Sequence, residues 1–157
     1  MNTRPDARIW RAAQQFFKAG EILWEHDDQF KCIFPLIMNY AFSCELSLKA
    51  TEALVKQSNK RPDTLLNVTY SKSKVQGHKL HVIFNKLHKD TQDGIKAKFF
   101  LITGQQLIPL LEKCSKYFVE VRYGFEIVGG SYAVSDLRIL AEGLLESVRI
   151  WGVDEEN

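Results

Sequence analysis

The chain of 157 residues lacks the features typical of membrane proteins, secreted proteins and zinc proteins. No apolar run approaches the roughly 20 residues that a membrane-spanning helix needs. The opening, MNTRPDARIW, is polar and has no apolar signal core. The cysteines, three in number, lie far apart and none shows the ligand spacing of a zinc site. We therefore expect a cytoplasmic protein with no membrane partner, no metal or other cofactor, and reduced, buried thiols.

Several chemistries are also missing. The chain has no nucleophilic triad and no dinucleotide fingerprint, and Gly129-Gly130-Ser131 alone is too little for a phosphate-binding loop. A net charge of +2 is too small to indicate nucleic acid by itself. The hydrophobic content of 45% and charged content of 25% are ordinary for a globular protein. At this length the simplest organisation is one domain over residues 1–157, with enough chain to bury a core.

What is present is helical periodicity. Apolar residues recur at helical spacing in six stretches, and only 65–70 suggests an extended segment. Pro5 and Asp6 suit the start of the first helix, Ser135 the N-cap of the last, and Gly152 its end. The predicted class is all-α, with helices over 6–25, 28–56, 77–87, 91–102, 105–123 and 135–151.

The region 57–77 differs from the rest. It is polar, and it carries Lys60, Arg61, Lys72 and Lys74 against the single acid Asp63. We interpret it as a long basic connection. Such a connection could meet phosphate, but with one aromatic among these cations a solvated segment is the favoured interpretation.

One carboxylate stands out in the most apolar helix. Glu45 lies in the stretch LIMNYAFSCELSLKATEALVK at 36–56, with Lys49 at i+4. A helix that is apolar on most sides belongs in the middle of a bundle, where a charge must be paired. Glu45 is therefore predicted to pair with Lys49, His78 or Arg122, and we expect all four to lie close together. The alternative is that Glu45 serves a functional site.

The histidines suggest metal binding only weakly. His78 and His81 are spaced i, i+3, and His88 follows, but no acidic or cysteine partner stands at a regular spacing. We therefore interpret His78 as a residue at a helix start, and His81 and His88 as surface residues.

Three fragments stand in order along the chain: CELSLKA at 44–50, GHKLHVIFNKL at 77–87 and VRYGFE at 121–126. This set resembles the HEPN family of small helical-bundle domains from prokaryotic toxin–antitoxin and antiviral-defence contexts. The resemblance implies an up-and-down bundle of four to six helices, a homodimer, and an RNA-directed role. Its characteristic positions fall on Glu45, Lys49, His78, Leu80, Arg122 and Tyr123.

One departure from the family bears on activity. Ribonuclease-active members carry an arginine followed, after four to six residues, by a histidine. Here Ile127, Val128 and Gly129 stand at those spacings from Arg122. We therefore expect no catalytic residue.

The expected function is a module that binds RNA or a nucleotide phosphate, a partner protein, or both. The ligand-binding candidates are Arg122, His78, Lys49, Glu45 and Tyr123, and a nucleotidyltransferase-like protein is a possible partner. Two alternatives stay open: a metal-independent ribonuclease with an altered site that uses His78, and a purely structural interaction protein.

Overall fold

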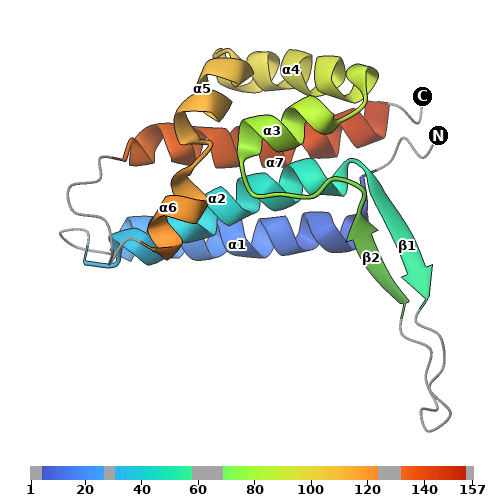
Figure 1. The fold of residues 1–157 in the computed structure, drawn as a ribbon. Coiled ribbons are helices and arrows are strands. Elements are labelled where there is room, and N and C mark those ends of the chain that lie inside the picture. The colour runs from blue at the N-terminus through green and yellow to red at the C-terminus, as the bar shows by residue number, and fades with distance from the viewer. Residues whose placement is uncertain (1–4, 27–30, 58–68, 124–131, 155–157) are drawn as a thin grey trace, which may run out of the picture.

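The computed structural model describes residues 5–26, 31–57, 69–123 and 132–154, and it confirms the predicted all-α helical bundle (Figure 1). Seven helical segments and one small hairpin make up these ranges. Their bounds are α1 Ala7–His26, α2 Ile33–Ala50, β1 Ala53–Gln57, β2 Thr69–Ser73, α3 Leu80–Lys86, α4 Lys89–Thr103, α5 Leu107–Cys114, α6 Tyr117–Arg122 and α7 Val134–Asp154. Among the described helices, none is both long and apolar enough to cross a bilayer.

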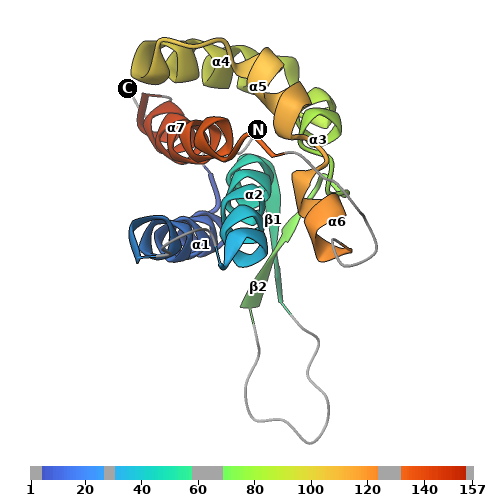
Figure 2. The ribbon, with the colours of Figure 1, turned by 90° about the vertical axis from the view of Figure 1, so that its left-hand side faces the viewer.

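Helix α2 is the centre of the bundle, as its sequence predicted. Ten of its 18 residues are buried, and it packs against α1, α3, α6 and α7. Figure 2 shows α2 with α1 and α7 on one side and α6 on the other. Helix α4 packs on α7 and forms an outer layer together with α5. An apolar helix enclosed in this way leaves little exposed surface for its one carboxylate.

Asp6 fixes the start of α1, as expected. Its Oδ1 accepts hydrogen bonds from the backbone N–H groups of Arg8 and Ile9, both at 3.0 Å. Two of the N–H groups that the first turn leaves unpaired are thereby satisfied. The backbone N–H of Asp6 donates to the carbonyl of Ala50 at 2.7 Å, and Ser71 Oγ donates to Asp6 Oδ2 at 2.6 Å. One residue therefore joins the start of α1, the end of α2 and the hairpin.

The hairpin corrects two predictions. The second helix was predicted to reach residue 56, but it ends at Ala50 and the chain continues as β1. Strand β1 pairs antiparallel with β2, with Ala53 opposite Ser73 and Gln57 opposite Thr69. Part of the predicted connection 57–77 is thus a strand, while 58–68 lies outside the described residues. The extended segment expected at 65–70 is confirmed where it overlaps β2, at Thr69 and Tyr70, whereas β1 gains its stability from pairing with β2, which local periodicity does not reveal.

The helix predicted over 105–123 is divided into α5 and α6, with a turn at Ser115 and Lys116. Ser115 is buried, and its Oγ accepts a hydrogen bond from the backbone N–H of His81 at 3.3 Å and also bonds His81 Nδ1. This tie binds the end of α5 to the first turn of α3. A serine that bonds a neighbouring helix in this way competes with continued helical pairing of the chain.

The boundaries predicted for the last helix need correction. Helix α7 begins at Val134, because the N–H of Leu137 already donates to the carbonyl of Ala133 at 3.0 Å, so Ser135 lies inside the first turn. Gly152 does not end the helix, which continues to Asp154. A Cβ at Gly152 would lie 2.4 Å from Pro5 Cδ. The glycine therefore allows a close approach between α7 and the start of α1.

The cysteines are only partly as expected. Cys44 and Cys114 are buried in the core, whereas Cys32 is exposed just before α2. Burial raises the pKa of the Cys44 thiol and raises the pKa of Cys114 to about 12. Because the thiolate is the reactive form, these two residues act as small apolar side chains.

We expect Gly20→Ala to destabilise the bundle by about 1–3 kcal/mol through overpacking. The added Cβ would lie 2.7 Å from Tyr40 Cδ1 and Cε1, and the Tyr40 ring is buried with its hydroxyl bonded to Glu21. Chemical denaturation measures the change, with Lys18→Ala, exposed on the same helix, as the control. A Gly20→Ala protein as stable as wild type would contradict this packing, because helix propensity alone favours alanine.

Candidate functional site: a cation–aromatic surface

The carboxylate of Glu45 has two cationic or proton-donating partners. Its side chain is almost completely buried, at 2% exposure. Lys49 Nζ lies 2.7 Å from Glu45 Oε1, and His78 Nδ1 lies 3.1 and 3.2 Å from the two carboxylate oxygens. The structure therefore brings together three of the four residues that were predicted to converge.

His78 turns its other face outward. Its side chain is half exposed and stands two residues before α3, next to Gly77, whose φ is 116°. A carboxylate only accepts hydrogen bonds, so the Nδ1–H of His78 is the donor in this contact. His78 Nε2 makes no hydrogen bond to any residue that the structure describes. Glu45 thus orients the imidazole of His78 through Nδ1, and Nε2 is the nitrogen that this contact does not use.

Arg122 does not contact Glu45, contrary to prediction, but reaches the cluster through Phe118. Its Cζ lies 5.8 Å from the ring centroid of Phe118 and 5.8 Å from that of Tyr123. The centroid of the His78 ring lies 5.5 Å from the centroid of the Phe118 ring. Phe118, and not a carboxylate, is therefore the residue that both Arg122 and His78 contact. Such contacts are within the range of cation–π attraction.

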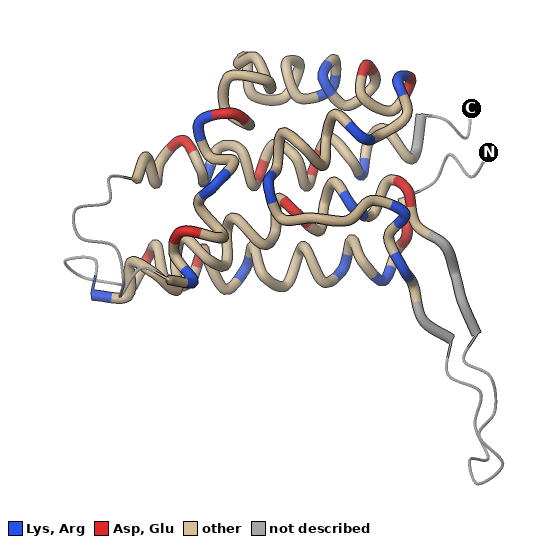
Figure 3. The backbone as a smooth tube through the Cα atoms, in the orientation of Figure 1, with Lys and Arg blue, Asp and Glu red and all other residues tan. Residues whose placement is uncertain are grey.

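Arg122 is exposed, and no carboxylate of the described residues pairs with it. Tyr123 is 47% exposed. We name His78, Phe118, Arg122 and Tyr123 the cation–aromatic surface. Figure 3 shows acidic and basic positions interspersed along the described parts of the backbone, so this surface depends on particular side chains rather than on a large net charge.

An apolar hollow adjoins this surface. It has a volume of about 460 Å³, and helices α1, α2 and α6 contribute its walls. We name it the aromatic groove, and its lining residues are Phe16, Phe34, Pro35, Met38, Asn39, Phe42 and Phe118. Phe118 belongs to both features, whereas Arg122, which contacts the Phe118 ring, is not among the residues that line the groove.

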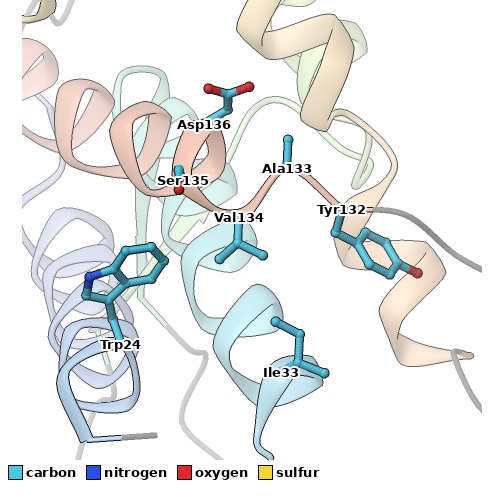
Figure 4. A pocket seen from close by; sticks show the side chains of 7 residues that line it. All are labelled: Trp24, Ile33, Tyr132, Ala133, Val134, Ser135 and Asp136. Atoms are coloured by element: carbon cyan, nitrogen blue, oxygen red, sulfur yellow. The ribbon is translucent and has the colours of Figure 1, made fainter. Parts of the chain in front are cut away.

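A second hollow, of about 530 Å³, lies where α1, α2 and the start of α7 meet. Figure 4 shows Trp24, Ile33 and Val134 around it, with the carboxylate of Asp136 turned to the other side of the chain. That carboxylate pairs with Lys113. None of the described residues that line this hollow is a lysine or an arginine, so it presents no fixed cation to a phosphate.

A polar network that the sequence analysis missed lies between α1, α2 and α7. Arg138 Nε and Nη2 donate to the two oxygens of Glu21 at 2.7 and 2.8 Å, and the Tyr40 hydroxyl donates to Glu21 Oε1 at 2.7 Å. The hydrogen bonds from Arg138 hold the pKa of Glu21 below its usual value, while burial raises the pKa of Tyr40. The Cζ atom of Arg138 also lies over the Trp24 ring, 5.2 Å from its centroid. A possible signal was Glu21 itself, which stands one turn from Phe17 and Trp24 on the apolar side of α1.

Two other histidines, His81 and His88, make structural contacts. His81 is partly buried and bonds Ser115, which corrects its assignment to the surface. His88 is half exposed, and its Nδ1 accepts from the N–H of Asp90 at the start of α4. Within the described ranges, no three His, Cys, Asp or Glu side chains gather closely enough to hold a metal ion.

Comparisons with known proteins found no match among protein-family models, curated proteins or solved structures. They therefore do not bear on the resemblance to the HEPN family, which stays a hypothesis carried by three sequence fragments. The functional argument rests on the geometry of the site.

We expect acid to destabilise the protein partly through Glu21. Its pKa is lowered in the folded state, so its contribution to stability is complete above the unfolded value of about 4.3 and is lost as the pH falls through the folded pKa. The free energies of unfolding of wild type and Glu21→Gln, measured by chemical denaturation between neutral pH and pH 3, should therefore converge as the pH falls. Glu142→Gln, exposed on α7, is the control. A constant difference between wild type and Glu21→Gln across this range would contradict the linkage.

Proposed function

We propose that this protein is a non-catalytic, HEPN-like module that binds single-stranded RNA through a phosphate at the cation–aromatic surface. The observation that carries the proposal is the state of Arg122. Arg122 is exposed, has no carboxylate partner among the described residues, and its Cζ lies 5.8 Å from the ring centroids of both Phe118 and Tyr123. A planar cation in this state is suited to bidentate contact with a phosphate.

The neighbouring side chains suit the same ligand. The half-exposed His78, whose ring contacts Phe118, offers Nε2, and the exposed side chain of Tyr123 offers a ring for base stacking. Glu45 and Lys49 largely neutralise each other, and Lys49 is only 14% exposed. In this proposal these two residues therefore position His78, and they do not contact the RNA.

The wider context is part of the proposal and rests on the family resemblance. A homodimer would present two copies of the surface. The setting would be a toxin–antitoxin or defence system, with a nucleotidyltransferase-like protein as the partner.

A second candidate function is supported by one contact. A buried carboxylate that holds one imidazole nitrogen and leaves the other open is the arrangement that orients a general base. The Glu45–His78 pair has this form. With Arg122 on the phosphate, this candidate is a ribonuclease with an altered site: His78 Nε2 takes the proton of a ribose 2′-hydroxyl, and the 2′-oxygen attacks the phosphorus. The bond from phosphorus to the 5′-oxygen breaks, and the imidazolium returns the proton to that oxygen. A ribonuclease must cleave RNA, whereas the proposed module only has to bind it.

We expect Arg122→Ala to weaken binding of a short single-stranded RNA by about fivefold to tenfold, because one phosphate contact is lost. The slope of log affinity against log salt should become shallower by about 0.7. Fluorescence anisotropy over a salt series measures both quantities. The matched control is Arg149→Ala, since Arg149 is an exposed arginine that Glu146 already pairs.

Cleavage is followed in the same samples with chelator present. Intact RNA with the expected loss in Arg122→Ala supports the module. Cleavage that disappears in both Arg122→Ala and His78→Gln would establish the altered-site ribonuclease instead. RNA binding unchanged by Arg122→Ala would overturn the proposed site.

A further inference from the structure

We propose that a groove between α4 and α7 is a docking site for a second protein, which binds there through a basic, amphipathic helix. The groove has a volume of about 300 Å³, and we name it the acidic groove. It shares no residue with the cation–aromatic surface, and Figure 2 shows α6, which carries Arg122, on the opposite side of α2 from α7. The inference therefore goes beyond the proposed function and does not depend on RNA binding.

The apolar part of the acidic groove results from a close approach of two helices. A Cβ at Gly143 of α7 would lie 2.4 Å from Phe99 Cε2 and 2.8 Å from Thr103 Cγ2 of α4. Because Gly143 has no side chain, the two helices can pack this closely. Ile102 of α4 and Ile139 of α7 are the large apolar residues that line the groove, and Ile102 is 40% exposed. The groove thus presents apolar surface to a partner.

The charged residues of the acidic groove favour a cation. Glu142 and Glu146 line it from α7, and neither lysine nor arginine is among the described residues that line it. The carboxylate of Glu142 is exposed and has no ion pair or hydrogen bond among the described residues. Glu146 accepts hydrogen bonds from Arg149 through Oε2 alone, at 2.9 and 3.0 Å. Two carboxylates one helical turn apart repel each other, so a cation that binds between them is stabilised.

A lysine or arginine of a partner matches both properties of the groove. Its aliphatic stem can cover Ile102 and Ile139 while its charged end reaches Glu142. The two residues before Ile102, Phe100 and Leu101, are 49% and 75% exposed. Consecutive large apolar side chains in water are typical of a protein interaction surface, and a free small cation would leave them uncovered. A helix that lies against two packed helices has both the apolar face and the basic residues that this surface requires.

The probe for the test is a synthetic amphipathic helix of leucine and lysine, and its affinity is measured by fluorescence anisotropy. Glu142→Gln and Ile102→Ala should each weaken its binding by about twofold to fivefold, as expected for one exposed ion pair or one partly buried side chain. The matched controls are Glu25→Gln and Ile22→Ala on α1, whose side chains are likewise exposed, at 64% and 60%. Neither control should change the affinity.

A gain of affinity is the second measurement. Arg149→Ala removes the arginine that engages Oε2 of Glu146, so the probe should bind about twofold more tightly. Arg11→Ala, exposed on α1, removes the same charge away from the acidic groove and should have no effect. In NMR spectra the methyl signals of Ile102 and Ile139 should shift as the probe is added.

Three results would overturn the inference. The first is a helix of leucine and glutamate that binds as tightly as the probe, because charge would then select nothing. The second is an equal loss in Glu142→Gln and Glu25→Gln, which indicates a general attraction to basic peptides. The third is a wild-type dimer in sedimentation that Ile102→Ala dissociates, because the occupant is then a second copy of the chain. The proposed function is tested separately, since Glu142→Gln should leave RNA binding unchanged and Arg122→Ala should leave binding of the probe unchanged.

Discussion

The bundle depends on placing one carboxylate in its most buried helix. Glu45 lies in α2, which four other helices surround, and its charge must be balanced within reach of a few side-chain atoms. Lys49 supplies one partner from the same helix, and His78 supplies the other from the segment before α3. The second contact fixes where the chain returns to α2 after the hairpin. It also decides that an imidazole, with one nitrogen open, stands at the edge of the core.

Beyond His78, the contacts at this edge of the core are made by the ring of Phe118 and not by ion pairs. Arg122 and His78 both contact the ring of Phe118, and Arg122 is exposed and does not pair with Glu45. Arg138 differs from Arg122, because its guanidinium donates hydrogen bonds to both carboxylate oxygens of Glu21. This contrast between two arginines of one chain is the reason to place ligand binding at Arg122. The proposed phosphate site therefore depends on one unpaired arginine and not on the net charge of the chain, which is only +2.

Sequence periodicity predicted the helices and the central place of α2, because burial of an apolar face repeats at helical spacing. The pairing of Glu45 with Lys49 was predicted from their i, i+4 spacing. The pairing of Glu45 with His78 was predicted from the need to neutralise a buried acid. The hairpin, the turn at Ser115 and the role of Gly152 escaped prediction, because each depends on a partner far away in the chain. For the same reason the aromatic groove was not foreseen. Its rings come from three helices whose relative placement no local pattern contains.

The most direct test of the account is an NMR titration of isotope-labelled protein with a short single-stranded RNA, followed on side-chain signals. The account predicts that the Arg122 Nε–Hε and His78 ring resonances shift together and saturate, while the Arg138 Nε–Hε signal, whose guanidinium is engaged by Glu21, stays in place. Shifts confined to other parts of the molecule, or none at saturating RNA, would contradict the claim that the cation–aromatic surface binds phosphate.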